Sequence, residues 1–343
     1  MTGTQPNGGA GMTDQGLAMR LHGVGDLRCA AEPRPVPGDG MSLVRVTAVG
    51  ICGSDLHWFS HGGIGDAQLR QPVVPGHEFA GVVEGGPLHG RRVAVDPAIP
   101  CTRCEHCRAG HGNLCPQVRF AGHGELDGAL REWIAWPTEL LHPLPDGLSD
   151  ADGAMLEPLG VAIHAVGLGH LRLGGSVAVV GCGPIGLLLV QLARVAGATR
   201  VLAVDRLEHR VAAARRYGAD QAMLDTGADV LDGADVDVAF EVAGNDDAVR
   251  TSVRAARPGG RVVLVGIPDE DQTTFPAGPA RRKGLTLALS RRMHEVYPRA
   301  IDLVRSGRID VGSLVTHRFT LLDSAEAFQT AAGRAGLKVL ITS

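Results

Sequence analysis

Four cysteines in one short stretch form the densest group of potential metal ligands in the chain: Cys101, Cys104, Cys107 and Cys115. Four thiolates at this spacing favour a closed tetrahedral zinc site, which has no open position and performs no chemistry of its own. An iron–sulfur cluster fits less well, because the last spacing is longer than in the bacterial ferredoxin pattern. We therefore predict a structural zinc ion that stiffens a loop.

A second set of potential ligands lies upstream and combines three donor types: the thiol of Cys52, the imidazole of His77 and the carboxylate of Glu78. Three protein ligands with an open fourth position are typical of catalytic zinc. Each residue alone is a weak signal, since a single cysteine after an apolar run is more often a core residue. The set gains weight from a nucleotide motif further along the chain.

That motif is the pattern G-x-G-x-x-G, formed by Gly181, Gly183 and Gly186 directly after the β-like run 176–180. Pro184 stands near the first turn of the helix that should follow. Glycine at these positions lets the chain turn tightly, lets the backbone approach a pyrophosphate and lets the helix pack on the strand. The context predicts a dinucleotide site at a helix N-terminus.

A carboxylate at the end of the next β-like run supports this prediction. Asp205 lies nineteen residues after Gly186, close to the position expected for the acidic residue that binds the adenosine ribose. An aspartate there also repels a 2′-phosphate, which favours NAD over NADP. Arg206, directly after it, keeps NADP open as an alternative.

The two halves of the sequence that must position these motifs have different secondary-structure patterns. The first half contains short β-rich runs separated by glycine, proline and histidine, and strands alternate with helices from Ser176 onward. The predicted strands include 42–50, 79–86, 91–97 and 261–266, and the predicted helices include 184–196, 208–217 and 295–305. Such alternation requires a parallel sheet wrapped by helices. The β-like run 314–321 matches the first half, so we expect the chain to return there.

Length and composition limit the class of protein. The 343 residues suggest two domains that share a cleft, and 44% hydrophobic with 20% charged residues is ordinary globular usage. The formal net charge of −4 argues against nucleic-acid partners, including a zinc ribbon at the four cysteines. The longest apolar run, 177–190, is too short to span a bilayer. No secretory signal is visible, so we expect a cytoplasmic protein without membrane association.

Several motifs together resemble one family, the zinc-dependent medium-chain alcohol dehydrogenases. They are GICGSDLHWF (50–59), GHEFAGVV (76–83), the four-cysteine lobe, MLEPLGVAIHA (155–165), VGCGPIG (180–186) and LVTHRFTL (314–321). Within the family, EPLGVAIHA, Trp58 and LVTHRF are most similar to the polyol branch of sorbitol, xylitol and L-idonate 5-dehydrogenases.

The resemblance implies an α/β chain of two domains behind a disordered tail (1–16). The first is a mostly β, GroES-like catalytic domain (17–158 and 293–343), and the second is a Rossmann coenzyme domain with a doubly wound parallel sheet (159–292). It also implies an assembly of two or four identical chains.

The resemblance assigns roles to individual residues. Cys52, His77 and Glu78 match the catalytic-zinc positions, and Glu157 falls where the polyol branch has a glutamate on or near the metal. Ser54 and His57 match a proton relay, and Asp55 matches a carboxylate that orients a ligand histidine. The positions that match cofactor contacts are Gly181, Gly183, Pro184, Ile185, Gly186, Asp205, Arg210, Val265, Gly266 and Ile267. The positions that match substrate contacts are Trp58, Phe120 and Arg292.

The implied activity is hydride transfer from a secondary alcohol of a polyol or sugar acid to NAD, with two zinc ions per chain. The segment Ser290-Arg291-Arg292-Met293 departs from the aromatic-Arg-aromatic run usual in the polyol branch, which leaves the substrate open. A zinc-dependent alcohol or threonine-type dehydrogenase with a non-sugar substrate is the alternative. A zinc-free reductase would need neither Cys52 nor the four cysteines, and a non-enzymatic nucleotide-binding protein would not need Ser54 and His57.

Overall fold

The computed structural model describes residues 15–124, 126–227, 230–275 and 277–342. Three small two-stranded sheets accompany two large ones in this part of the chain: β1 (Gln15–Gly23) with β2 (Asp26–Pro33), β4 (Gly63–Ile64) with β5 (Ala67–Gln68), and β8 (Ala98–Ile99) with β9 (Arg119–Phe120). The predicted tail falls on residues 1–14, which are outside the described residues, and on Gln15 and Gly16. For these two residues the prediction is wrong, because they pair with β2 as part of β1.

The first large sheet is arranged around β3 (Met41–Gly50). One edge of β3 pairs with β6 (Glu78–Glu84), and the other pairs with β10 (Trp133–Pro137) and then with β19 (Lys338–Thr342). The outer strands are β7 (Arg92–Val95), β11 (Leu141–Pro143) and β18 (Val315–Thr320). Apolar side chains such as Val44, Phe79 and Trp136 form the buried core of this sheet.

The second large sheet is parallel and has the order β14-β13-β12-β15-β16-β17. Its strands are β12 (Ser176–Val180), β13 (Arg200–Asp205), β14 (Gln221–Leu224), β15 (Val236–Glu241), β16 (Ala256–Leu264) and β17 (Thr286–Leu289). The helices that connect them are α5 (Pro184–Val195), α6 (Glu208–Arg216), α7 (Asp246–Ala255) and α8 (Ala277–Lys283). The strand order reverses at β12, which places a ligand crevice at the carboxyl ends of β12 and its neighbours.

The predicted elements agree with the structure in type and differ by a few residues at their ends. Helix α5 ends one residue before the predicted 184–196, and α9 (Tyr297–Arg305) begins two residues after the predicted 295. Strand β16 begins at Ala256 rather than 261, because its first residues pair with the start of β15 through an irregular register. Pro184 occupies the first turn of α5, where its missing N–H costs nothing.

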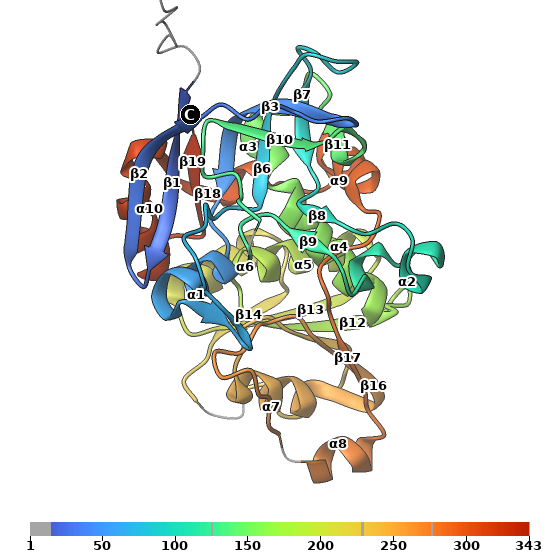
Figure 1. The fold of residues 1–343 in the computed structure, drawn as a ribbon. Coiled ribbons are helices and arrows are strands. Elements are labelled where there is room, and N and C mark those ends of the chain that lie inside the picture. The colour runs from blue at the N-terminus through green and yellow to red at the C-terminus, as the bar shows by residue number, and fades with distance from the viewer. Residues whose placement is uncertain (1–14, 125, 228–229, 276, 343) are drawn as a thin grey trace, which may run out of the picture.

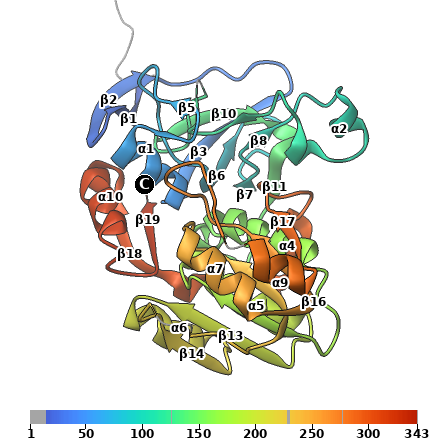
Figure 2. The same cartoon turned by 90° about the horizontal axis from the view of Figure 1, so that it is seen from below.

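The C-terminal segment returns to the first sheet. Strand β19 pairs with the end of β3, and β18 extends the sheet by a parallel pairing with β19. Helix α10 (Ser324–Ala332) connects them and packs on α1 (Gly53–His61), so the last residues lie beside the N-terminal strands in both views (Figures 1 and 2).

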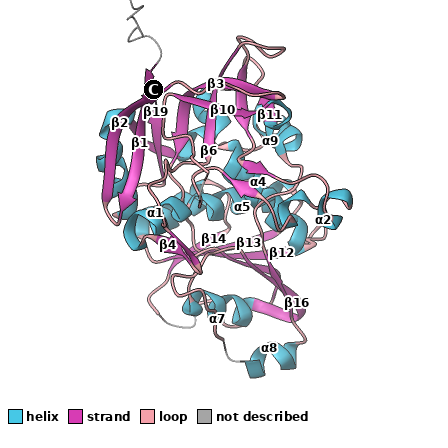
Figure 3. Ribbon diagram, in the orientation of Figure 1, coloured by secondary structure: helices cyan, strands magenta, loops and turns pink. Residues whose placement is uncertain are grey.

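Helix α4 (Leu156–Gly169) joins the two large sheets after the short helix α3 (Asp150–Ala154). It contacts β6 on one side and β15 and β16 on the other, and Figure 3 shows α4 and α5 between the two groups of strands. One hydrophobic cluster runs from Ala80 through Leu159 to Val177, so the two sheets share part of their core. The predicted domain boundary after residue 158 lies inside α4. Among the described residues, no helix is long and apolar enough to cross a membrane.

Candidate active site

Strand register brings the mixed ligand set together. Gly50 at the end of β3 pairs directly with Glu78 at the start of β6, and Cys52 follows as the N-cap residue of α1. The ligand atoms of Cys52, His77 and Glu78 lie within 4.8 Å of one another. His77 and Glu78 are buried, with 3% and 1% exposure, so their polar atoms depend on partners within the protein.

The carboxylate of Asp55 ties the two ligand segments to each other. Its Oδ2 accepts a hydrogen bond from the Cys52 N–H at 2.9 Å, and its Oδ1 accepts one from the Gly76 N–H at 3.2 Å. Oδ1 also lies 3.3 Å from His77 Nδ1. Burial raises the pKa of Asp55, but the charge and hydrogen bond of His77 and the Cys52 N–H outweigh burial, and the net pKa is lowered.

The side chain of His77 is oriented by this contact. Because Nδ1 faces Asp55, Nε2 is the nitrogen directed toward Ser54, whose Oγ lies 3.3 Å away. Burial lowers the pKa of His77, but Asp55 and Cys52 raise it by a larger amount, so the net pKa lies well above the usual value. Without a metal this ring therefore favours the protonated form, and a metal ion would replace the proton on Nε2, with the carboxylate behind Nδ1 as in other metal-ligating histidines.

Glu78 has a buried cation beside it that the sequence analysis did not identify. Lys338 in β19 forms an ion pair with Glu78 Oε2, and the two side chains are 2% and 1% exposed. Gly50 makes room for this pair, because a Cβ at Gly50 would collide with Glu78 Oε2 and approach Lys338 Cε. The missed signal was the register of β19 against β3, since Lys338 stands two residues before the partner of Gly50, Leu340.

Glu157 at the start of α4 lies near the three ligands but outside their group. Its side chain is buried, and burial raises its pKa to about 8, an effect opposed by His77 and Lys338. Asp96 lies close by, and burial raises its pKa to about 6.

Aromatic and polar side chains line the side of the ligand set that faces Arg292. The Phe120 ring centroid lies 5.2 Å from that of His77, and the Arg292 guanidinium carbon lies 4.3 Å from the centre of the Phe120 ring. The ring centroid of His123 lies 5.7 Å from that of Trp58 and 5.0 Å from that of Phe120. Burial lowers the pKa of His123 to about 3, so its imidazole is neutral at pH 7.

Three buried polar atoms of this wall have no hydrogen-bond partner: Trp58 Nε1, His123 Nε2 and Arg292 Nη1. Buried polar groups are nearly always paired in folded proteins, so unpaired ones indicate a ligand or water. Arg292 also has a φ of 57°, a left-handed conformation that is uncommon for residues other than glycine. Arg291 beside it is exposed.

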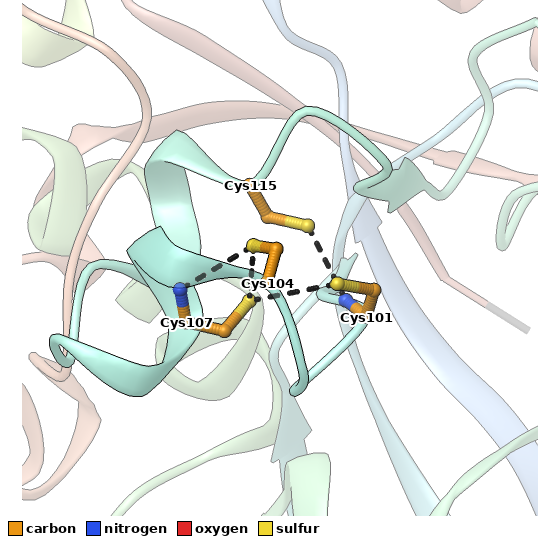
Figure 4. A group of neighbouring side chains, drawn as sticks. All are labelled: Cys101, Cys104, Cys107 and Cys115. Atoms are coloured by element: carbon orange, nitrogen blue, oxygen red, sulfur yellow. Dashed lines mark hydrogen bonds between the residues drawn. The ribbon is translucent and has the colours of Figure 1, made fainter.

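The four cysteines of the lobe between β8 and β9 converge as predicted (Figure 4). None of them forms a disulfide. The Sγ atoms of Cys104 and Cys107 are 3.4 Å apart and those of Cys101 and Cys107 are 4.0 Å apart, which brackets the edge of about 3.8 Å for a tetrahedron with zinc–sulfur bonds of about 2.3 Å. Backbone N–H groups of Arg103 and Cys104 lower the pKa of Cys101 to about 6. The short helix α2 (Glu105–Arg108) lies within the lobe.

The cysteine lobe contacts the segment that carries Arg292. The side-chain amide of Asn113 donates to the Arg291 carbonyl at 3.0 Å, and His294 Nε2 contacts the Gly110 carbonyl. Phe120 directly follows the lobe in β9. The lobe thus supports two residues of the wall opposite His77.

The glycine loop lies between β12 and α5, where it was predicted. Gly181 has a φ of 101°, and a Cβ at Gly186 would collide with the Gly181 carbonyl, so both positions require glycine. A Cβ at Gly183 would have only Arg210 Nη1 within 4 Å, so this face of the loop is open. Ile185 lies in the first turn of α5.

Asp205 and Arg210 border the loop on the β13 side. Asp205 accepts hydrogen bonds from the Cys182 N–H at 2.7 Å and from the Leu207 N–H at 2.9 Å. Arg210 Nη1 lies 4.0 Å from Asp205, and the buried Nε of Arg210 has no partner. By contrast, Arg206 is turned to solvent and pairs with Asp247 at 3.4 Å and Asp225 at 3.9 Å.

Val265, Gly266 and Ile267 follow the end of β16. The N–H groups of Val265 and Gly266 donate to the Glu241 carbonyl at 2.8 and 3.1 Å. A Cβ at Gly266 would collide with Gly244, so the ends of β15 and β16 are in close contact. Ile267 is 44% exposed at this edge, next to the open ends of the parallel strands.

The donor sets fit the groups that they were predicted to bind. One thiolate, one imidazole and one carboxylate leave a fourth position open, whereas the four thiolates of the cysteine lobe close a tetrahedron. The open glycine loop at a helix N-terminus, with the unpartnered Arg210 Nε beside it, fits an anionic dinucleotide.

Comparisons with known proteins match the chain over nearly its whole length. Residues 38–146 match the model of the alcohol dehydrogenase GroES-like domain, and residues 184–306 match that of the zinc-binding dehydrogenases. A probable D-xylulose reductase from Neosartorya fischeri is 36% identical over 96% of this chain and 97% of its own. Sorbitol dehydrogenase from Gallus gallus is 37% identical over 96% and 97%. The crystal structure of L-idonate 5-dehydrogenase from Escherichia coli is similar with a TM-score of 0.89, at 27% identity, over 96% and 98% of the two chains.

Replacing Asp55 by asparagine should weaken zinc binding at the mixed ligand set. The Asp55→Asn side chain cannot accept hydrogen bonds through both of its terminal atoms, so Cys52 and His77 lose their common support. We expect the zinc affinity to fall about 10–100-fold. The measurement is zinc per chain after dialysis against a graded series of chelator concentrations. The control is Asp39→Asn at an exposed carboxylate, and an unchanged zinc affinity in Asp55→Asn would contradict the role given to Asp55.

Proposed function

We propose that the chain oxidises a secondary alcohol of a neutral polyol with NAD. The proposal starts from its family, because the chain belongs to the zinc-dependent medium-chain dehydrogenases, in the branch that includes the polyol dehydrogenases. The two-sheet α/β architecture agrees with this family, as predicted. The observation that carries the proposal is the convergence of Cys52, His77 and Glu78 beside a wall of unpaired polar atoms.

We assign Cys52, His77 and Glu78 to a catalytic zinc ion and the four cysteines of the lobe to a structural one. Zinc in the open site would supply a Lewis acid that lowers the pKa of the substrate hydroxyl. Glu157 is close enough to influence the site electrostatically, and it lies outside the group of three ligand atoms. We therefore place Glu157 around the metal site rather than among its first three ligands.

Proton transfer is the task of Ser54 and His57. The Ser54 hydroxyl is buried beside His77 Nε2, where it can accept the proton of the substrate hydroxyl. His57 lies one turn further along α1 with a partly exposed ring, which allows it to pass a proton to solvent. Burial lowers the pKa of His57, so its ring is neutral at pH 7 and can accept a proton.

The cofactor side of the site favours NAD. NAD accepts the hydride, and the protein contributes its placement. Gly181, Gly183 and Gly186 would let the backbone approach the pyrophosphate, Asp205 and Arg210 would hold the adenosine, and Val265 to Ile267 would contact the nicotinamide. Arg206, the residue that would favour a 2′-phosphate, is engaged by Asp225 and Asp247.

The wall around Arg292 favours a neutral, hydroxyl-rich substrate. Trp58 Nε1 and His123 Nε2 belong to uncharged groups at pH 7, and together with Arg292 Nη1 they offer hydrogen bonds to several hydroxyls. Asp96, whose pKa of about 6 leaves it mostly ionised at pH 7, lies near Arg292, so a substrate carboxylate would meet a like charge there. Sugar acids such as L-idonate are the competing substrate class.

We also propose the predicted division into a GroES-like domain (17–158 and 293–343) and a Rossmann domain (159–292), a homodimer or homotetramer, and a cytoplasmic location. Strand β17 is an edge strand whose Leu289 is 76% exposed, which suits pairing with a second chain. The cysteines are all free thiols, which suits a reducing compartment.

Two cysteine substitutions should separate the two zinc sites. Cys52→Ser should abolish NADH formation from a polyol at an almost unchanged melting temperature, because it removes a ligand from the open site only. Cys104→Ser should lower the melting temperature, because it weakens the metal binding that holds the lobe closed. Elemental analysis should give two zinc ions per parent chain and about one in each variant. Retained turnover in Cys52→Ser would refute the catalytic assignment and with it the proposed function.

The cofactor preference should depend on Asp205. We expect kcat/KM for NAD to exceed that for NADP in the parent protein, and Asp205→Ser to narrow the ratio by removing the charge that repels a 2′-phosphate. Arg206→Ala is the matched control and should leave NAD use unchanged. Equal use of both cofactors by the parent would show that Arg206 outweighs the carboxylate.

The substrate class should depend on Arg292. The measurement is kcat/KM for sorbitol, xylitol and L-idonate with the parent, with Arg292→Ala and with Arg291→Ala as the exposed neighbour control. We expect a neutral polyol to be preferred and Arg292→Ala to lose tenfold or more, ~1.4 kcal/mol of transition-state binding. If L-idonate is preferred by tenfold and loses that lead only in Arg292→Ala, the substrate is a sugar acid instead.

A further inference from the structure

A further group of potential metal-ligating side chains lies at the C-terminal end of α1. His57 and His61 are separated by one helical turn, and their ring centroids are 5.8 Å apart. Two histidines at positions i and i+4 of a helix project from one face and can bind one metal ion, as in the H-E-x-x-H motif. His57 is half-buried and His61 is exposed, so the pair is open to solvent on one side.

The third side chain of the group comes from the other part of the chain. Asp269 follows β16, and its Oδ1 lies 3.3 Å from His57 Nδ1. The same two segments lie close together at a second point. A Cβ added at Gly65, in the turn between β4 and β5, would lie only 2.7 Å from the Asp271 side chain. The segment after α1 and the loop after β16 therefore touch at two points.

The geometry of the three groups suits a transition metal ion. One ligand atom each from His57, His61 and Asp269 lies within 4.8 Å of the others. The separation of 3.3 Å between His57 and Asp269 equals the edge, about 3.3 Å, of a tetrahedron with zinc–ligand bonds of about 2.0 Å. Two imidazoles and a carboxylate are ligands that zinc, copper and nickel accept. The fourth position faces solvent, since the Asp269 side chain is 72% exposed.

We propose that His57, His61 and Asp269 form a third metal site, which binds Zn²⁺ or a similar transition metal ion and inhibits the enzyme. The inhibitory part rests on the proposed function, in which His57 passes the proton to solvent. A metal ion on His57 withdraws the ring nitrogen from proton transfer. The same ion links α1 to the loop after β16 and so restrains the two parts of the chain between which the cofactor must enter and leave.

The test uses the untagged, zinc-loaded chain, to which ZnSO₄ is added at micromolar concentrations after desalting. Equilibrium dialysis with elemental analysis should show a third zinc ion per parent chain, and turnover should fall as it binds. His61→Ala and Asp269→Asn should each weaken this binding and the inhibition about tenfold or more, where the inhibition is measured relative to the turnover of the same variant without added zinc. Loss of a direct ligand should cost at least as much as loss of an outer-shell partner, which is roughly 10–100-fold.

His22→Ala provides the matched control, because His22 is an exposed histidine on β1 and should behave as the parent. The site is refuted if the parent binds no third ion, or if both variants bind it with the parent's affinity. The inhibitory role alone is refuted if the third ion binds through these residues and turnover does not change. If no polyol is oxidised at all, the proposed function fails, while the dialysis experiment still decides whether the site exists.

Discussion

The buried carboxylate of Asp55 is the contact on which the metal site depends. It joins two segments that the sequence separates, the start of α1 with Cys52 and the start of β6 with His77, through two backbone N–H groups and one imidazole. A buried carboxylate is costly unless hydrogen bonds replace its lost water. The fold provides these donors because β3 and β6 pair with Gly50 opposite Glu78. The Asp55 side chain therefore depends on the register of β3 and β6, caps the start of α1 and orients His77.

Local patterns in the sequence predicted the parts of the site whose geometry is local. The spacing of the four cysteines and of the three glycines needs no knowledge of the fold, because residues close in sequence supply all the atoms. Asp205 needs one further assumption, that the next strand pairs in parallel with the strand before the loop, as β13 does with β12. Lys338 could not be found this way, since its partner Glu78 lies far along the chain and the two meet only through the pairing of β19 with β3. His123 could not be found this way either, because a polar loop gives no sign that Trp58 and Phe120 will pack against it.

The two large sheets are less independent than the different sequence patterns of the two halves suggested. Helix α4 belongs to both, since it contacts β6 and β16, and it carries Glu157 at the end that faces the metal ligands. The cluster from Ala80 to Val177 is a shared core rather than a surface contact between two finished domains. This shared core connects the segment that carries the mixed ligand set to the segment that carries the glycine loop, and the loop after β16 meets α1 at a separate point, where Asp269 contacts His57.

The contact between the cysteine lobe and the Arg292 segment has an evolutionary consequence. Arg292 holds an unfavourable backbone conformation, and the neighbouring carbonyl of Arg291 is bound by Asn113 of the lobe. Substitutions in the lobe can therefore shift the guanidinium without changing any residue that touches substrate. Natural variation in this cysteine lobe, which carries none of the proposed reacting groups, is therefore a route by which related enzymes can diverge in substrate while their reacting groups stay the same.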